Sequence, residues 1–104
     1  MHFGTINIGT LKDKTEEIIH TMEYRNLKIL GLAETRLKGS GQRRLHDDFE
    51  LFFSSENENT RHGVALILDP NIALFVERVL YINSRIIAIT LNITDYKLSF
   101  IHFK

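Results

Sequence analysis

The residues best suited to chemistry are an amide and a carboxylate, each placed at the end of a short apolar segment. Glu34 follows the uninterrupted apolar run 29–33, and Asn7 stands near the end of segment 3–8. A buried strand that delivers one acid at its tip is typical of an active-site edge, because ligands of open α/β sheets bind at the carboxyl ends of the strands. A strand-end glutamate is more often a cap or a surface residue, so the residues alone leave both alternatives open.

Basic residues follow the carboxylate. Segment 35–44 is rich in glycine and serine, reads as a flexible loop and carries four of the thirteen basic residues of the chain. These four residues are Arg36, Lys38, Arg43 and Arg44. Basic side chains on a loop beside a carboxylate could follow a phosphate backbone. The alternative is a solvated loop whose cations contact only water, and the sequence alone favours that alternative.

A histidine and two acids in a row, His46, Asp47 and Asp48, are a further candidate set of metal ligands. Adjacent residues of an extended chain point in opposite directions, so their side chains would not converge on one ion. We therefore expect a solvated turn at this place.

The elements that position the amide and the carboxylate follow from the hydrophobic pattern. Residues 3–8 are partly alternating and rich in β-branched side chains, which indicates a strand. Residues 29–33 form a continuous apolar run typical of a parallel strand covered on both faces. Helical spacing between them predicts an amphipathic helix that ends near Asn26, with Thr10 and Asp13 as a capping box. Strand, helix and strand in this order form a right-handed crossover, so both strand ends should meet at one edge of a sheet.

The rest of the chain reads as β-structure. A polar turn is expected at 55–62, a proline turn at 69–71, and a tight connection through Thr94 and Asp95. The expected strands are 49–54, 64–68, 73–81, 85–93 and 96–103. Consecutive strands with short links form an antiparallel meander, which we expect from residue 63 onward. The predicted fold class is thus α/β (α+β), a βαβ unit followed by an antiparallel meander.

Composition bounds the class of protein. A chain of 104 residues suffices for one domain, 1–104, or for part of one. Thirteen Lys and Arg balance thirteen Asp and Glu, so any attraction for nucleic acid must come from a local cluster. The absence of cysteine excludes disulfides and thiolate chemistry. We expect no membrane partner and, without a secretory leader, an intracellular protein, nuclear or cytoplasmic.

Segments 5–11, 30–37 and 61–68 together resemble the opening half of the endonuclease/exonuclease/phosphatase family. The likeness is greatest to the apurinic-type endonuclease domains of non-LTR retrotransposons. The resemblance extends over essentially the whole chain. Each motif alone is a weak signal, and the three motifs in register make the resemblance specific.

The resemblance implies the first part of a four-layered α/β sandwich and the hydrolysis of DNA phosphodiesters with Mg²⁺. In such enzymes the strand-end asparagine orders the site and contacts phosphate or metal-bound water, which corresponds to Asn7. The glutamate that ends the second strand binds the metal, which corresponds to Glu34. This role is physically reasonable, because Mg²⁺ prefers hard oxygens and needs about one or two carboxylates when a phosphate supplies the rest.

The family pattern continues with a tyrosine, an aspartate–asparagine pair, and a final aspartate and histidine. The sequence ends at Lys104 before these positions, so we expect the N-terminal half of such a domain. His102 lies in an alternating strand and is expected to be structural rather than a substitute for the distant histidine. Each missing general acid or base typically contributes about 10²–10⁴-fold, so we expect no significant nuclease activity from this chain alone.

Two alternatives to a nuclease fragment stay open. One is a non-catalytic module that binds nucleic acid through the four basic residues of segment 35–44. The other is a protein-interaction module, because one sheet of a two-sheet sandwich would leave its apolar inner face uncovered and open to self-association. That face would include Leu66, Leu68, Ile87, Ile89 and Phe100.

Overall fold

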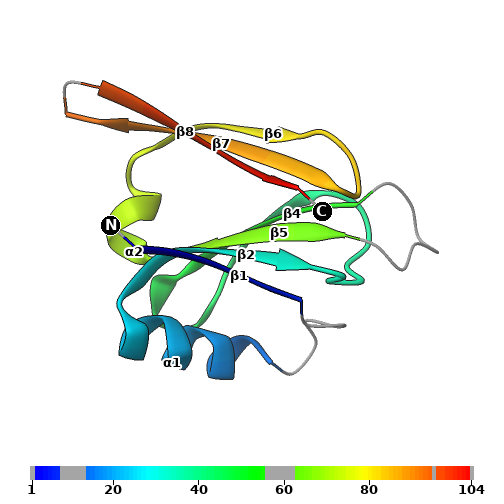
Figure 1. Cartoon of the computed structure of the whole chain (residues 1–104), viewed down its shortest axis with the longest axis horizontal. Helices are drawn as coiled ribbons and strands as arrows, with labels where there is room; N and C mark the ends of the chain where they lie inside the picture. Colours follow the sequence, from blue (N-terminus) through cyan, green and yellow to red (C-terminus); the bar gives the residue numbers. More distant parts are fainter. Residues whose placement is uncertain (1, 8–13, 56–62, 95, 104) are drawn as a thin grey trace.

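The computed structural model describes residues 2–7, 14–55, 63–94 and 96–103 (Figure 1). Within these ranges the chain is a mixed α/β structure, in which two helices accompany two sheets of mostly antiparallel strands. The helices are α1 (Thr15–Arg25) and α2 (Pro70–Ala73), and a 3-10 turn, η1, spans His46–Asp48. The strands are β1 (His2–Asn7), β2 (Leu27–Ala33), β3 (Gly41–Arg44), β4 (Glu50–Ser54), β5 (Val64–Leu68), β6 (Val76–Tyr81), β7 (Ile86–Ile93) and β8 (Tyr96–Phe103).

The first sheet has five strands in the order β1-β2-β5-β4-β3. β1 and β2 pair in parallel, with Asn7 opposite Ala33. The other neighbours are antiparallel, and both Ala33 and Ser54 lie opposite Val64. This pairing brings the carboxyl ends of β1, β2 and β4 to one edge of the sheet.

Helix α1 covers one face of the first sheet (Figure 1). Its apolar side chains Ile18, Ile19 and Met22 are buried. They pack against the side chains that β2, β4 and β5 direct to that face, which are Leu30, Leu32, Leu51, Phe53, Ala65 and Ile67. The helix ends at Asn26, whose left-handed backbone lets its N–H reach the carbonyl groups of the last turn. Neither helix of the described ranges is long and apolar enough to cross a membrane.

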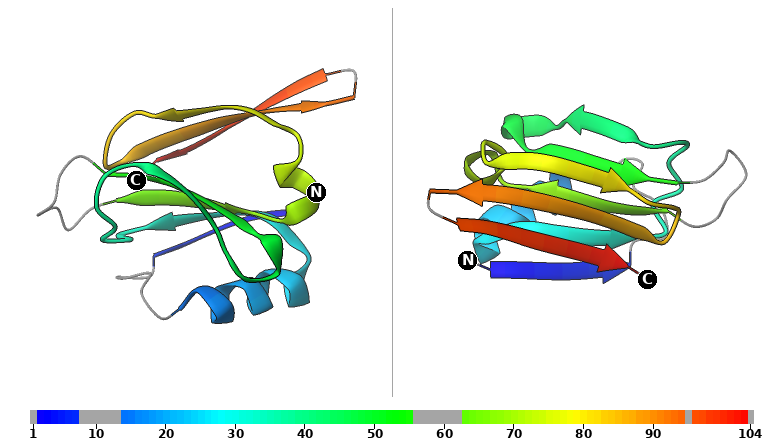
Figure 2. Two further views of the ribbon diagram at one scale, coloured as in Figure 1. Left: turned by 180° about the vertical axis from the view of Figure 1, so that it is seen from behind. Right: turned by 90° about the horizontal axis from the view of Figure 1, so that it is seen from above.

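The second sheet, in the order β6-β7-β8, lies over the other face of the first sheet (Figure 2). Alternation along β7 buries Ile87, Ile89 and Leu91. They pack against the side chains that the first sheet directs to this face, which are Ile29, Phe52, Val64, Leu66 and Leu68. The first sheet is therefore covered by apolar contacts on both faces, which explains the continuous apolar runs at 29–33 in β2 and along β5.

The expectation of an uncovered inner face is wrong. Leu66, Leu68 and Ile87 are 0% exposed, Ile89 is 1% exposed, and Phe100 packs against the same cluster. The reason is that this chain contains strands of both sheets, whose inner faces cover each other. β5 pairs between β2 and β4 in the first sheet, so the meander consists of β6, β7 and β8 and does not begin at residue 63.

The segment after Glu34 also differs from expectation. Residues 41–44, interpreted as part of a flexible loop, form the edge strand β3, because they pair with β4 from Gly41 opposite Phe53 to Arg44 opposite Glu50. The turn expected at 46–48 is present as η1, and its residues are exposed.

The proline turn is one turn of helix. Asp69 caps α2, because its Oδ1 accepts a hydrogen bond from the Asn71 N–H at 2.8 Å, and Pro70 occupies the first helical position. Ala73 therefore belongs to α2, and β6 begins only at Val76. The expected capping box at 10–13 and most of the expected turn at 55–62 lie outside the described residues.

Candidate functional site

The candidate site is the edge at which β1, β2 and β4 end and β3 and β5 begin, on the right of Figure 1. Asn7 is the last residue of β1 and is paired with Ala33, the residue before Glu34. The backbones of both predicted site residues therefore lie at the same edge. The side chain of Asn7 is not among those that the structure describes.

The backbone changes direction at Glu34. Glu34 and Arg36 both have left-handed conformations, with φ of 58° and 59°. Such conformations are uncommon for these residue types and cost about 1–3 kcal/mol each, so they persist where surrounding contacts hold them. Glu34 is half-buried and Arg36 is exposed, and both follow a strand whose last five residues, 29–33, are buried.

Thr35, between these residues, was not identified from the sequence. It is 2% exposed, and its N–H donates to the Gly63 carbonyl at 3.4 Å. Its Oγ1 is buried without a hydrogen-bond partner among the described residues, a situation that typically costs about 1–3 kcal/mol. The nearest sequence signal was Gly63, a glycine immediately before an apolar strand, which often marks a close approach of two backbones.

His102 supports the candidate edge from the second sheet. Its Nε2–H donates to the Leu32 carbonyl at 3.0 Å, and the side chain is 8% exposed. The ring lies so close to Gly31 that a Cβ at that glycine would be 2.7 Å from Nδ1. These contacts agree with the expectation that His102 is structural.

The four basic candidates do not form one patch. Arg36 and Lys38 are exposed near the candidate edge. Arg43 places its guanidinium 5.1 Å from the centroid of the Phe53 ring, on the α1 side of the sheet. Arg44 points to the opposite side, because adjacent residues of a strand alternate.

Arg44 is also committed to another partner. Its Nε–H donates to Glu50 Oε1 at 3.1 Å, and Gln42 donates to the other oxygen of the same carboxylate. Glu50 is the first residue of β4, and Ser54, the last residue of β4, lies at the candidate edge. The four-residue rise between them places Arg44, the partner of Glu50, roughly 13 Å from that edge.

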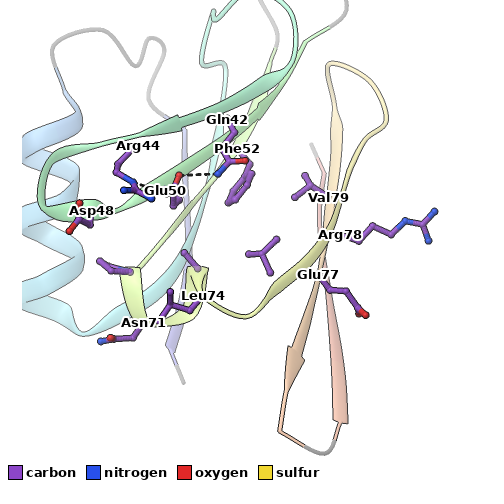
Figure 3. A pocket seen from close by; sticks show the side chains of 13 residues that line it. Gln42, Arg44, Asp48, Glu50, Phe52, Asn71, Leu74, Glu77, Arg78 and Val79 are labelled. Carbon is purple, nitrogen blue, oxygen red and sulfur yellow. Dashed lines mark hydrogen bonds and ion pairs between the residues drawn. The ribbon is translucent and has the colours of Figure 1, made fainter.

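An open groove of about 640 Å³ lies between β3 and β4 of the first sheet and β6 of the second, beside α2 (Figure 3). Phe52 and Val79 face it from the two sheets, and Gln42 and Glu50 interact on one of its sides (Figure 3). The groove is at the end of β4 that is remote from Glu34. It is therefore separate from the candidate edge.

A metal ion at the candidate edge would depend on Glu34. Among the residues of the described ranges, no group of three or more His, Cys, Asp and Glu side chains is arranged to hold an ion. The edge fits Mg²⁺ as a partly hydrated ion on one protein carboxylate, because that ion keeps several waters and takes further oxygens from a phosphate.

A scan against protein-family models finds no match for the chain, and a search of curated proteins finds none either. The resemblance to the endonuclease/exonuclease/phosphatase family thus rests on the three sequence motifs and stays a prediction.

Proposed function

We propose that the chain is the N-terminal part of a magnesium-dependent DNA endonuclease domain of the endonuclease/exonuclease/phosphatase family, and that its strand-end edge binds Mg²⁺ together with a DNA phosphate. The observation that carries the proposal is the position and backbone conformation of Glu34 at the sheet edge. Glu34 follows a strand whose last five residues are buried, has a left-handed backbone and is half-buried at the sheet edge. The neighbouring parallel strand ends there in Asn7.

The proposed roles follow from the chemistry of the side chains. Glu34 supplies the carboxylate for a hydrated Mg²⁺, which when bound neutralises charge on a phosphoryl oxygen. Arg36, exposed two residues later, supplies a second positive group for the phosphate. Hydrolysis also needs groups that activate water and protonate the leaving oxygen. His102 is committed to the Leu32 carbonyl, so we propose binding without appreciable hydrolysis by this chain alone.

The proposal includes the finer fold assignment, the first part of a four-layered α/β sandwich. In that assignment β1, α1 and β2 are the βαβ unit. It is supported by the parallel pairing of β1 with β2, by α1 on one face of the first sheet, and by the contact of the two sheets through one apolar cluster.

Paramagnetic Mn²⁺, a substitute for Mg²⁺, tests the metal site. In two-dimensional amide NMR spectra, Mn²⁺ should selectively broaden the signals of residues 33–36. Glu34→Gln should abolish this broadening because it removes the anionic oxygen. Glu23→Gln, the same change at an exposed residue of α1, should preserve it. Unaltered signals at 33–36, or equal broadening in both variants, would contradict the proposed site.

A nicking assay on supercoiled plasmid with Mg²⁺ tests the absence of hydrolysis. We expect no appreciable cleavage by the chain alone. Nicking that disappears in Glu34→Ala would show instead that the described edge is catalytically sufficient.

A non-catalytic nucleic-acid-binding module is the second candidate, favoured by the exposure of Arg36 and Lys38 beside the edge. Binding to a short DNA duplex at two salt concentrations, without divalent metal, tests it. Arg36→Ala or Lys38→Ala should each reduce the slope of log K against log salt by about 0.9, the effect of one lost phosphate contact with duplex DNA. Arg44→Ala is the matched control, because Arg44 is paired with Glu50. An equal loss in Arg44→Ala, or a binding constant insensitive to salt, would argue against this candidate.

A further inference from the structure

The segment 34–36 has a buried side chain between two less buried ones. Thr35 is 2% exposed, whereas Glu34 is half-buried and Arg36 is exposed. Glu34 and Arg36 both have left-handed backbones. Neither glutamate nor arginine favours that conformation, so contacts of the segment with the rest of the protein must maintain it.

Thr35 lies close to Gly63, to whose carbonyl its N–H donates at 3.4 Å. A Cβ at residue 63 would stand 2.6 Å from Thr35 Oγ1 and 3.5 Å from the Arg36 nitrogen. The first separation is shorter than real Cβ contacts permit, so Thr35 can occupy this place only because residue 63 has no side chain. Gly63 also has a φ of 143°, a region that residues with side chains rarely adopt.

We propose that Thr35, seated against Gly63, is the positioning residue of the strand-end site. Its burial holds the left-handed backbone on either side and so fixes the positions of Glu34 and Arg36 at the sheet edge. A preorganised pair of this kind binds more tightly, because less ordering is needed on binding. The part that concerns metal and phosphate rests on the proposed function, whereas the part that concerns the backbone does not.

The shape of the Thr35 side chain carries this role. Its Oγ1 makes no hydrogen bond within the described ranges, so removal of the hydroxyl breaks no contact that orients the segment. Valine has nearly the same shape and lacks the hydroxyl, which makes Thr35→Val the matched control. Thr35→Ala removes the side-chain atoms that pack against Gly63. Gly63→Ala introduces a Cβ, which the close approach of Thr35 leaves no room for.

Two measurements on the whole chain test the inference. The first is hydrogen exchange of the amide of residue 35 in metal-free protein, referenced to core amides of β5 that report global stability. Thr35→Ala and Gly63→Ala should accelerate exchange at residue 35 by about tenfold relative to those core amides, because the packing of residue 35 against residue 63 is lost. Thr35→Val should exchange like the unsubstituted protein.

The second measurement is the Mn²⁺ concentration that half-broadens the amide signals of residues 33–36. It should rise several-fold in Thr35→Ala and Gly63→Ala and stay unchanged in Thr35→Val. The inference would be overturned if Thr35→Ala showed the exchange rate and Mn²⁺ response of the unsubstituted protein. It would also be overturned if Thr35→Val showed the same losses as Thr35→Ala.

These outcomes separate the inference from the proposed function. If Mn²⁺ does not affect residues 33–36 of the unsubstituted protein, the proposed metal site fails, and the exchange data still decide whether Thr35 holds the backbone. If Mn²⁺ acts at residues 33–36 and neither Thr35→Ala nor Gly63→Ala changes exchange or affinity, the metal site stands and the positioning role fails.

Discussion

Substitution of Gly31 by alanine should destabilise the protein, although glycine-to-alanine changes in strands usually do the opposite. An alanine Cβ at this position would lie 2.7, 2.8 and 2.9 Å from Nδ1, Cε1 and Cγ of His102. Ordinary carbon contacts are about 3.5–4.0 Å, so the ring would have to move by roughly 0.8 Å. The ring is 8% exposed and is tied to the Leu32 carbonyl at 3.0 Å, which leaves it little room to move.

The magnitude follows from these opposing effects. Overpacking of a buried contact costs about 1–3 kcal/mol, whereas a strand glycine replaced without a clash gains about 0.5–1 kcal/mol. In a His102→Ala background the ring is gone, so the same Gly31→Ala change should be neutral or stabilising. The coupling free energy between the two substitutions should then be about 1.5–4 kcal/mol.

Urea unfolding followed by far-ultraviolet circular dichroism measures these free energies, and it suits a chain that contains no tryptophan. Gly41→Ala is the matched control, because its Cβ would approach the Phe53 ring only to 3.3 Å. The reasoning would be refuted if Gly31→Ala left the free energy of unfolding unchanged, or if its cost persisted undiminished in the His102→Ala background.

The remaining expectations concern the second sheet. Ile89→Ala should lower the free energy of unfolding by about 2–5 kcal/mol because Ile89 is 1% exposed, and Ile101→Ala should change it by less than about 0.5 kcal/mol because Ile101 is 65% exposed. Equal costs in urea unfolding would contradict the assignment of inner and outer faces. Burial raises the pKa of Tyr81 above its ordinary value of 10.0, so the folded protein keeps a proton that the unfolded chain loses. Stability should therefore fall as the pH rises above about 10 toward the folded-state pKa, and Tyr81→Phe should remove that part of the fall. A phenolate absorbance titration of the unsubstituted protein and of Tyr81→Phe gives the titration of Tyr81 as their difference. A difference curve with the midpoint of an unperturbed tyrosine would exclude the shift.

Hydrophobic periodicity was sufficient to predict most individual strands. Segments 49–54, 64–68 and 96–103 match β4, β5 and β8 closely, because each has a distinct apolar face or a continuous apolar run bounded by turn residues. Periodicity could not assign strands to sheets. Leu66 and Ile87 are both apolar and both face the same core, yet Leu66 belongs to the first sheet and Ile87 to the second.

The candidate edge could be predicted only in part. The order of strand, helix and strand predicted that β1 and β2 are parallel and end at one edge, and the structure adds the register, in which Asn7 lies opposite Ala33. The left-handed backbone at Glu34 and Arg36 has no signal in those residue types, and the close approach of Thr35 to Gly63 involves two residues that are remote in sequence. The divergence of Arg43 and Arg44 follows from simple alternation, and it was missed because residues 41–44 were interpreted as a loop.

The hydrogen bond between His102 and Leu32 joins residues 70 positions apart in the chain. Contacts of such large sequence separation form late in folding, because the intervening loop must close before the contact contributes any stability. During synthesis β2 would leave the ribosome well before its neighbour β5 and before β8. Strand β2, which precedes Glu34, should therefore reach its native surroundings only when nearly all of the described chain has been made. Until then its apolar residues are a segment that a chaperone would bind.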